Sequence, residues 1–108
     1  MIYELRIYEA VPGRLPDLHK RFDTITLKIW DRLGIKQAGF WTNEVGPSNQ
    51  ELIYLLAWES LAEREQKWDA FQRDEERLAA FAKTEAGGPL VQRIHNSILR
   101  PTHYSPMK

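Results

Sequence analysis

The segment Glu51–Trp58, which reads Glu-Leu-Ile-Tyr-Leu-Leu-Ala-Trp, constrains the fold of this chain more than any other stretch. It is short, it is bounded by turn residues, and every position after Glu51 is apolar or aromatic. Side chains of a β-strand point alternately to the two faces of a sheet, so a strand with one wet face alternates between apolar and polar residues. This strand does not alternate, and we therefore expect both of its faces to be covered.

The first third of the chain predicts a strand followed by a long helix. In Ile2–Ala10 an apolar side (Tyr3, Leu5, Ile7) alternates with a mixed side (Ile2, Glu4, Arg6, Tyr8). Residues 14–33 carry apolar side chains at steps of three and four, which is the period of an amphipathic helix, with Leu27 and Trp30 lying off the main stripe. Gly34 is expected to end this helix.

The remaining sequence predicts a hairpin, a second helical region and a last strand. Residues 35–45 form the expected second strand, in which Gly39 indicates a bulge or a close backbone approach. Ser60 and Glu63 form a capping box directly after Glu51–Trp58, and Asp74 is suited to cap a further helical piece. Gly87-Gly88-Pro89 ends that piece, and residues 90–100 form the last expected strand.

The order β-α-β-β-α-β predicts one α+β domain over residues 1–108 with the ferredoxin-like arrangement, a four-stranded antiparallel sheet with both helices on one face. The other face of the sheet is then bare in a monomer. Tyr8, Trp41, Val45 and one side of Glu51–Trp58 would form an exposed apolar patch on it. We therefore expect a homodimer in which an identical sheet, related by a two-fold axis, covers this face.

Composition excludes several classes of function. The 15 basic residues balance the 15 acidic ones, which argues against a nucleic-acid or anionic-membrane surface. The chain has no cysteine, so disulfides, thiolate nucleophiles and iron–sulfur ligation are excluded and a reducing compartment fits. No apolar run is long enough to span a bilayer and no leader precedes the first strand, from which we expect a cytoplasmic protein.

No motif in the sequence assigns a reaction. There is no nucleophile elbow, P-loop or dinucleotide fingerprint, and the three histidines lack metal-ligand spacing, so no catalytic residue, metal or cofactor is assigned. His95 shares a strand side with Arg93 and Ser97; if Glu4, Arg6 and Tyr8 lie on that same side, they would form a ligand pocket. The alternative is a satisfied Arg6–Glu4 pair and a hydrogen-bonded histidine, since structural ion pairs also fill such interiors.

Aromatic residues and one arginine complete the candidates. Trp41, Trp58 and Trp68 could wall a flat apolar ligand, or could serve only core and interface packing. Arg64 could anchor an anion, or could pair with Glu63 or another surface carboxylate. The full set of candidate ligand-binding residues is Arg6, Tyr8, Trp41, Trp58, Arg64, Trp68 and His95.

An ordered set of residues along the chain resembles the NIPSNAP family, within the dimeric α/β-barrel superfamily. The matching features are Glu4-Leu5-Arg6 and Tyr8, Pro12-Gly13, Gly39 and Trp41, Trp58, Ser60, Arg64, Trp68, Phe71 and Asp74. One departure is Arg77, where family members often place another tryptophan. The resemblance implies a ferredoxin-like dimer and little about activity. Mitochondrial relatives carry a targeting extension, which is absent here, so the resemblance implies a bacterial cytoplasmic protein.

Three functional hypotheses follow. The first is a dimer that binds a small apolar or aromatic molecule. The second, implied by the wider superfamily, is a cofactor-independent oxygenase or a haem-handling enzyme, although His95 on a strand does not match a haem-ligating histidine on a helix. The third is a non-catalytic protein-interaction module.

Overall fold

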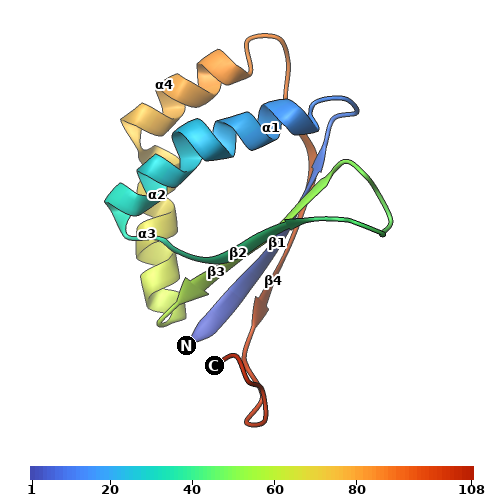
Figure 1. Cartoon of the computed structure of the whole chain (residues 1–108). Helices are drawn as coiled ribbons and strands as arrows, with labels where there is room; N and C mark the ends of the chain where they lie inside the picture. The colour runs from blue at the N-terminus through green and yellow to red at the C-terminus, as the bar shows by residue number, and fades with distance from the viewer.

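The computed structural model describes all 108 residues. The chain forms β1 (Ile2–Ala10), α1 (Leu15–Arg21), the π-helical turn η1 (Phe22–Thr26), α2 (Leu27–Leu33), β2 (Lys36–Thr42), β3 (Glu51–Trp58), α3 (Leu61–Arg73), α4 (Glu75–Thr84) and β4 (Val91–Leu99). The strands make one antiparallel sheet in the order β2-β3-β1-β4, with all the helices on one face (Figure 1). The expected ferredoxin-like fold is confirmed, and β3 is an internal strand.

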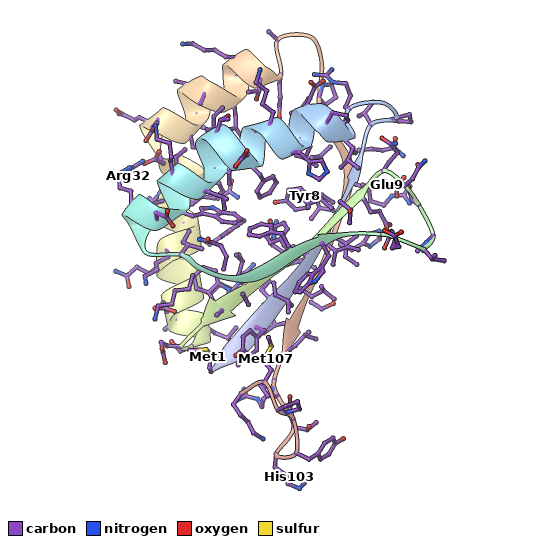
Figure 2. All side chains as sticks on the ribbon, viewed as in Figure 1. Met1, Tyr8, Glu9, Arg32, His103 and Met107 are labelled. Atoms are coloured by element: carbon purple, nitrogen blue, oxygen red, sulfur yellow. The ribbon has the colours of Figure 1, made fainter.

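The strand register decides which side chains face the helices. Arg6 of β1 lies opposite Tyr54 of β3, and Tyr8 lies opposite Leu52. These four residues are buried, as are the other members of the same two rows, Ile2, Glu4, Ala10, Leu56 and Trp58. The mixed side of β1 therefore packs under the helices. Our placement of Tyr8 on the bare face was wrong: it lies between sheet and helices (Figure 2).

The opposite face of the sheet has no helix over it (Figure 1). Tyr3, Leu5 and Ile7 of β1 share this face with Ile53 and Leu55 of β3, and all five are half-buried. We call it the open face. Glu51–Trp58 thus has one side buried under helices and another that is apolar and only partly covered.

Gly39 marks a break in register between β2 and β3, as the sequence predicted. A Cβ placed on Gly39 would lie 2.6 Å from the ring of Trp41, which occupies the space a side chain would need. Trp41 pairs with Ile53 and therefore belongs to the open face, where it is 49 % exposed.

The first helical region is one rod interrupted by the π turn, and it ends at Gly34 in the left-handed conformation (φ 75°), as expected. The π turn has one more residue between hydrogen-bonded groups than an α turn. Residues beyond it are therefore rotated about the axis relative to an uninterrupted α-helix. Trp30, which the α-helical period placed off the main stripe, is completely buried. Its ring contacts Phe22, Phe40, Tyr54, Trp68 and Phe71.

The expected caps begin both later helices. Ser60 accepts a hydrogen bond from the Glu63 amide, and Asp74 accepts one from the Arg77 amide. The Glu63 carboxylate accepts from the amide of Glu59, one residue before the position usual in a capping box. None of the helices is both long and apolar enough to cross a bilayer.

Candidate ligand-binding site

A cavity of about 190 Å³ lies between the helices and the sheet. Six aromatic rings surround it: Tyr8 from β1, Phe22 and Trp30 from the first helical rod, Trp68 and Phe71 from α3, and Phe81 from α4. The remaining lining residues are Arg6, Arg21, Thr26, Gln72, Arg77, Glu85, Val91 and Ile94. Every layer of the fold contributes to this wall, so the closed fold is needed to form it.

The aromatic wall is held by ring-to-ring packing. Trp30 meets Phe22 and Phe71 edge-on, with ring centroids 5.6 and 5.8 Å apart, and Trp68 lies 5.1 Å from Phe71. Such T-shaped and tilted pairs are the preferred aromatic geometry, and each stabilises the fold beyond its buried area. The apolar part of the site is therefore largely preformed.

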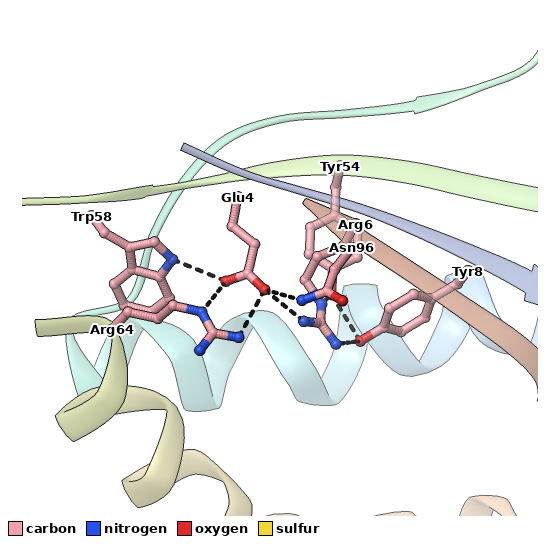
Figure 3. A network of polar contacts seen from close by, with 7 residues as sticks. All are labelled: Glu4, Arg6, Tyr8, Tyr54, Trp58, Arg64 and Asn96. Atoms are coloured by element: carbon pink, nitrogen blue, oxygen red, sulfur yellow. Dashed lines mark hydrogen bonds and ion pairs between the residues drawn. The ribbon is translucent and has the colours of Figure 1, made fainter. Parts of the chain in front are cut away.

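Glu4 is the centre of a buried polar network beside the cavity (Figure 3). Its carboxylate accepts hydrogen bonds from Arg6, from Arg64 at both oxygens, from the Trp58 indole and from the Asn96 amide, at 2.8 to 3.1 Å. Burial alone would raise the pKa of Glu4. The hydrogen bonds from Arg64, Asn96 and Arg6 outweigh burial and lower this pKa to about 2.

Arg6 carries the network to the cavity wall. Its Nε donates to the Tyr54 hydroxyl at 2.9 Å, Tyr54 donates to the Tyr8 hydroxyl at 2.8 Å, and the guanidinium lies 4.5 Å from the Trp68 ring centroid. Burial favours neutral Arg6, but the oxygens of Tyr8, Tyr54 and Glu4 more than offset it, so the pKa of Arg6 is raised. Burial raises the pKa of Tyr54 well above its usual value. Both groups keep their neutral-pH charge states.

Four buried polar atoms in residues that line the cavity have no hydrogen-bond partner in the protein. They are Nε of Arg21, Oγ1 of Thr26, Nε1 of Trp30 and Nε of Arg77. Unpaired buried polar atoms are uncommon in folded proteins, because each costs the free energy of its desolvation. All four belong to residues that line this one cavity, but the atoms themselves lie behind its surface, so a ligand would reach them only after a side-chain movement.

The structure brings together only part of the predicted site. Arg6, Tyr8 and Trp68 line the cavity. Trp58 and Arg64 hold Glu4 behind this wall, with Arg64 paired to a buried carboxylate instead of Glu63. The alternative of an Arg6–Glu4 pair is realised at 2.8 Å.

Two predicted residues lie away from the cavity. His95 pairs with Ile7, so it lies on the opposite side of the sheet from Glu4, Arg6 and Tyr8, and the condition for grouping them is not met. Trp41 also belongs to the open face, so the three tryptophans do not form one wall.

Sequence reasoning missed Arg21, Thr26, Trp30, Arg77 and Glu85. Arg21 follows Leu18 by three residues and therefore falls on the buried stripe of its helix, which is an unusual place for an arginine and was a usable signal. Arg77 precedes Phe81 by four residues, a spacing that stacks the two side chains on one helix face. No group of three or more His, Cys, Asp or Glu residues is placed to hold a metal ion.

Comparisons with known proteins agree with this architecture. A NIPSNAP family protein with unknown function from Agrobacterium tumefaciens has a solved structure that is 28 % identical to this chain, covers 100 % of it and 94 % of its own length, and superposes with a TM-score of 0.84. A second NIPSNAP family protein from that organism is 23 % identical over 99 % of this chain and 98 % of its own, with a TM-score of 0.87. A comparison with curated proteins finds no match.

A more distant solved structure shares the fold alone. It comes from Nitrosomonas europaea, is provisionally described as an antibiotic biosynthesis monooxygenase, and is 8 % identical over 95 % of this chain and 100 % of its own, with a TM-score of 0.63. The NIPSNAP family model, in contrast, matches residues 3–106, nearly the whole sequence. The chain therefore belongs to the NIPSNAP family.

Proposed function

We propose that this protein binds one small apolar or aromatic molecule in the cavity between the helices and the sheet. The observation that carries the proposal is a cavity walled by six aromatic rings, with three arginines among its other lining residues. Ligand sites have this character, with apolar walls and a few polar groups that fix orientation. An apolar cavity of roughly 150 Å³ holds benzene, so about 190 Å³ suits a single substituted ring.

The test is titration calorimetry of the purified protein with single-ring aromatic compounds, both neutral and charged. We expect saturable binding with one ligand per chain and a matching rise in melting temperature. A panel in which no compound binds would contradict the proposal.

The proposal concerns binding and not catalysis. The likeness to the Nitrosomonas europaea structure extends to the fold alone, and it provides no side chain to carry a reaction. Arg6 and Tyr54 keep their neutral-pH charge states, which suits orienting a ligand better than exchanging protons with it.

The second part of the proposal is a homodimer formed through the open face. Tyr3, Leu5, Ile7, Ile53 and Leu55 make an apolar surface with no helix over it, and such surfaces are typical of interfaces. A second copy is the simplest partner, because a two-fold axis lets the same surface cover itself. For location we propose the cytoplasm, whose reducing conditions fit a chain without cysteine.

A further inference from the structure

Arg21 and Arg77 stack on the same ring at one end of the cavity. The Arg21 Cζ lies 4.1 Å from the Phe81 ring centroid, and the Arg77 Cζ lies 4.7 Å from it. Arg77 also lies over Phe71 at 4.8 Å. Two guanidinium groups are thus fixed by aromatic stacking beside the same cavity. Because they are already ordered, they lose little conformational entropy when they bind a ligand.

The cations around the cavity outnumber the anions. Arg6, Arg21 and Arg77 line it, whereas Glu85 is the only carboxylate that does. Glu85 is paired with Arg21 at 2.8 Å, and Arg6 shares the single carboxylate of Glu4 with Arg64. Arg77 has no carboxylate partner: its guanidinium makes one hydrogen bond, a 3.3 Å contact to the carbonyl oxygen of Gln72.

The chemistry of the unpartnered atoms points the same way. The Nε atoms of Arg21 and Arg77 and the indole Nε1 of Trp30 are donors only, and the Thr26 hydroxyl can also donate. Thr26 and Trp30 are 2 % and 0 % exposed, and their polar atoms lie behind the cavity surface, so neither water nor a ligand reaches them without a side-chain movement. An oxyanion in the cavity would accept hydrogen bonds from the guanidinium groups of Arg21 and Arg77 and would compensate the excess positive charge.

We propose that the ligand of this cavity carries a carboxylate, held by the guanidinium groups of Arg77 and Arg21, on a single aromatic or apolar ring that packs against the aromatic wall. This inference rests on the proposed function and names the class of ligand: small aromatic or cyclic carboxylic acids. A planar carboxylate matches the planar fork of an arginine, and the remaining volume accommodates one ring.

Burial of Arg77 supports this assignment. Burial disfavours its charged form and the neighbouring charge of Arg21 adds to that effect, so that together they lower the pKa of Arg77. A bound carboxylate would offset both effects, so the site favours an anion over a neutral ligand of equal shape.

The test compares acids with their amides, which have the same shape and no charge. Benzoate and benzamide, and phenylacetate and phenylacetamide, are titrated into the full-length protein by calorimetry at neutral pH. We expect each acid to bind at least tenfold tighter than its amide. In the Arg77→Met variant, which keeps an apolar stem over Phe81, we expect acid affinity to fall at least tenfold and amide affinity to fall far less.

Arg73→Met is the matched control, because Arg73 is exposed on α3 and lies outside the cavity. It should leave both affinities unchanged. Circular dichroism and the melting temperature of each variant establish that it folds, and Arg77→Gln serves in its place if Arg77→Met does not.

The outcomes separate the two proposals. Equal binding of acid and amide, or acid binding that is indifferent to both Arg77 variants, would overturn the carboxylate assignment and leave the aromatic site standing. Acid binding lost equally in Arg77→Met and Arg73→Met would also overturn it, because the effect would then be one of general charge. If neither acids nor amides bind, both proposals fail.

Discussion

Arg64 extends from α3 to hold both carboxylate oxygens of Glu4 on β1, with Nε at 2.8 Å and Nη2 at 3.1 Å. Glu4 is completely buried, and Arg6 binds the same carboxylate from within the strand. This arrangement explains why the mixed side of β1 can lie under the helices. The charged side chains satisfy one another there, so the usual cost of burying a charge is largely offset.

Replacing Glu4 should unfold the protein far more easily than replacing an exposed acid. In Glu4→Gln the positive charges of Arg6 and Arg64 lose their common partner, and breaking a buried pair in this way costs about 3–5 kcal/mol. The exposed Arg14–Asp17 pair provides the control, since Asp17→Asn should cost less than about 1 kcal/mol. Urea unfolding measures both. Equal losses in the two variants would show that the Glu4 network is not a major source of stability.

The pKa of Glu4 predicts how stability depends on pH. It is lowered from 4.5 to about 2 in the folded protein, so ionised Glu4 stabilises the fold fully above pH 4.5 and this contribution is lost as the pH falls toward 2. The difference between these pKa values corresponds to on the order of 3 kcal/mol. The stability gap between wild type and Glu4→Gln, measured by urea unfolding, should therefore narrow steadily below pH 4.5. A gap that stays constant throughout this interval would contradict the assignment.

The unpaired hydroxyl of Thr26 should lower the free energy of unfolding of the protein. Thr26→Val removes a buried hydroxyl that has no partner and keeps the shape of the side chain, so the ligand-free protein should become more stable by about 1 kcal/mol. The same change should leave benzoate binding nearly unchanged, because the hydroxyl lies behind the cavity surface. Thr84→Val is the contrasting variant, because the Thr84 hydroxyl is engaged with Arg21 and with the carbonyl of Phe81. It should be destabilising. Thermal melts with and without benzoate distinguish the two, and a destabilised Thr26→Val would contradict the prediction.

Filling the cavity should abolish binding of single-ring compounds. Ile94 of β4 lines the cavity, whereas Ile98 on the same side of the same strand does not. The two are similarly exposed, at 48 % and 42 %. Ile94→Trp should therefore reduce affinity in calorimetry at least tenfold, and Ile98→Trp should leave it unchanged. Equal effects of the two substitutions would place the binding site elsewhere.

A charge on the open face should break the proposed dimer. By light scattering, the wild type should have twice the 12.7 kDa mass of the chain, and Ile53→Lys should have the mass of one chain. Leu78→Lys, which adds the same charge on the exposed surface of α4, should remain a dimer. A wild type that is monomeric at micromolar concentration would refute the dimer.

The elements of the fold could be read from the sequence because their signals are local. The Gly39 bulge, the Ser60 and Asp74 caps and the Gly34 stop each depend on a few neighbouring residues. The π turn leaves no such signal, since it depends on hydrogen bonds that shift by one residue. The α-helical period therefore placed Trp30 off the main apolar stripe, although this residue is completely buried.

The cavity was harder to predict than the fold, because it depends on which elements pack together. The alternation in β1 was correct, but alternation does not say which side meets the helices. Polarity favoured the wrong side for Tyr8, because Glu4 and Arg64 find each other only across 60 positions of sequence. Arg21 and Arg77 belong to helices that meet only after folding.

The residues that line the cavity differ in how strongly the fold depends on them, and this difference determines which of them can be replaced to change ligand selectivity. Arg6 serves both the cavity and the Glu4 network, so altering it to suit another ligand would weaken the fold. The Thr26 hydroxyl makes no hydrogen bond and Arg77 has no carboxylate partner, so replacing either residue breaks no ion pair, although Arg77 also stacks on Phe71 and Phe81. An engineer who wishes to redirect this scaffold to neutral, basic or larger molecules should therefore randomise Thr26 and Arg77 first and leave Arg6 untouched.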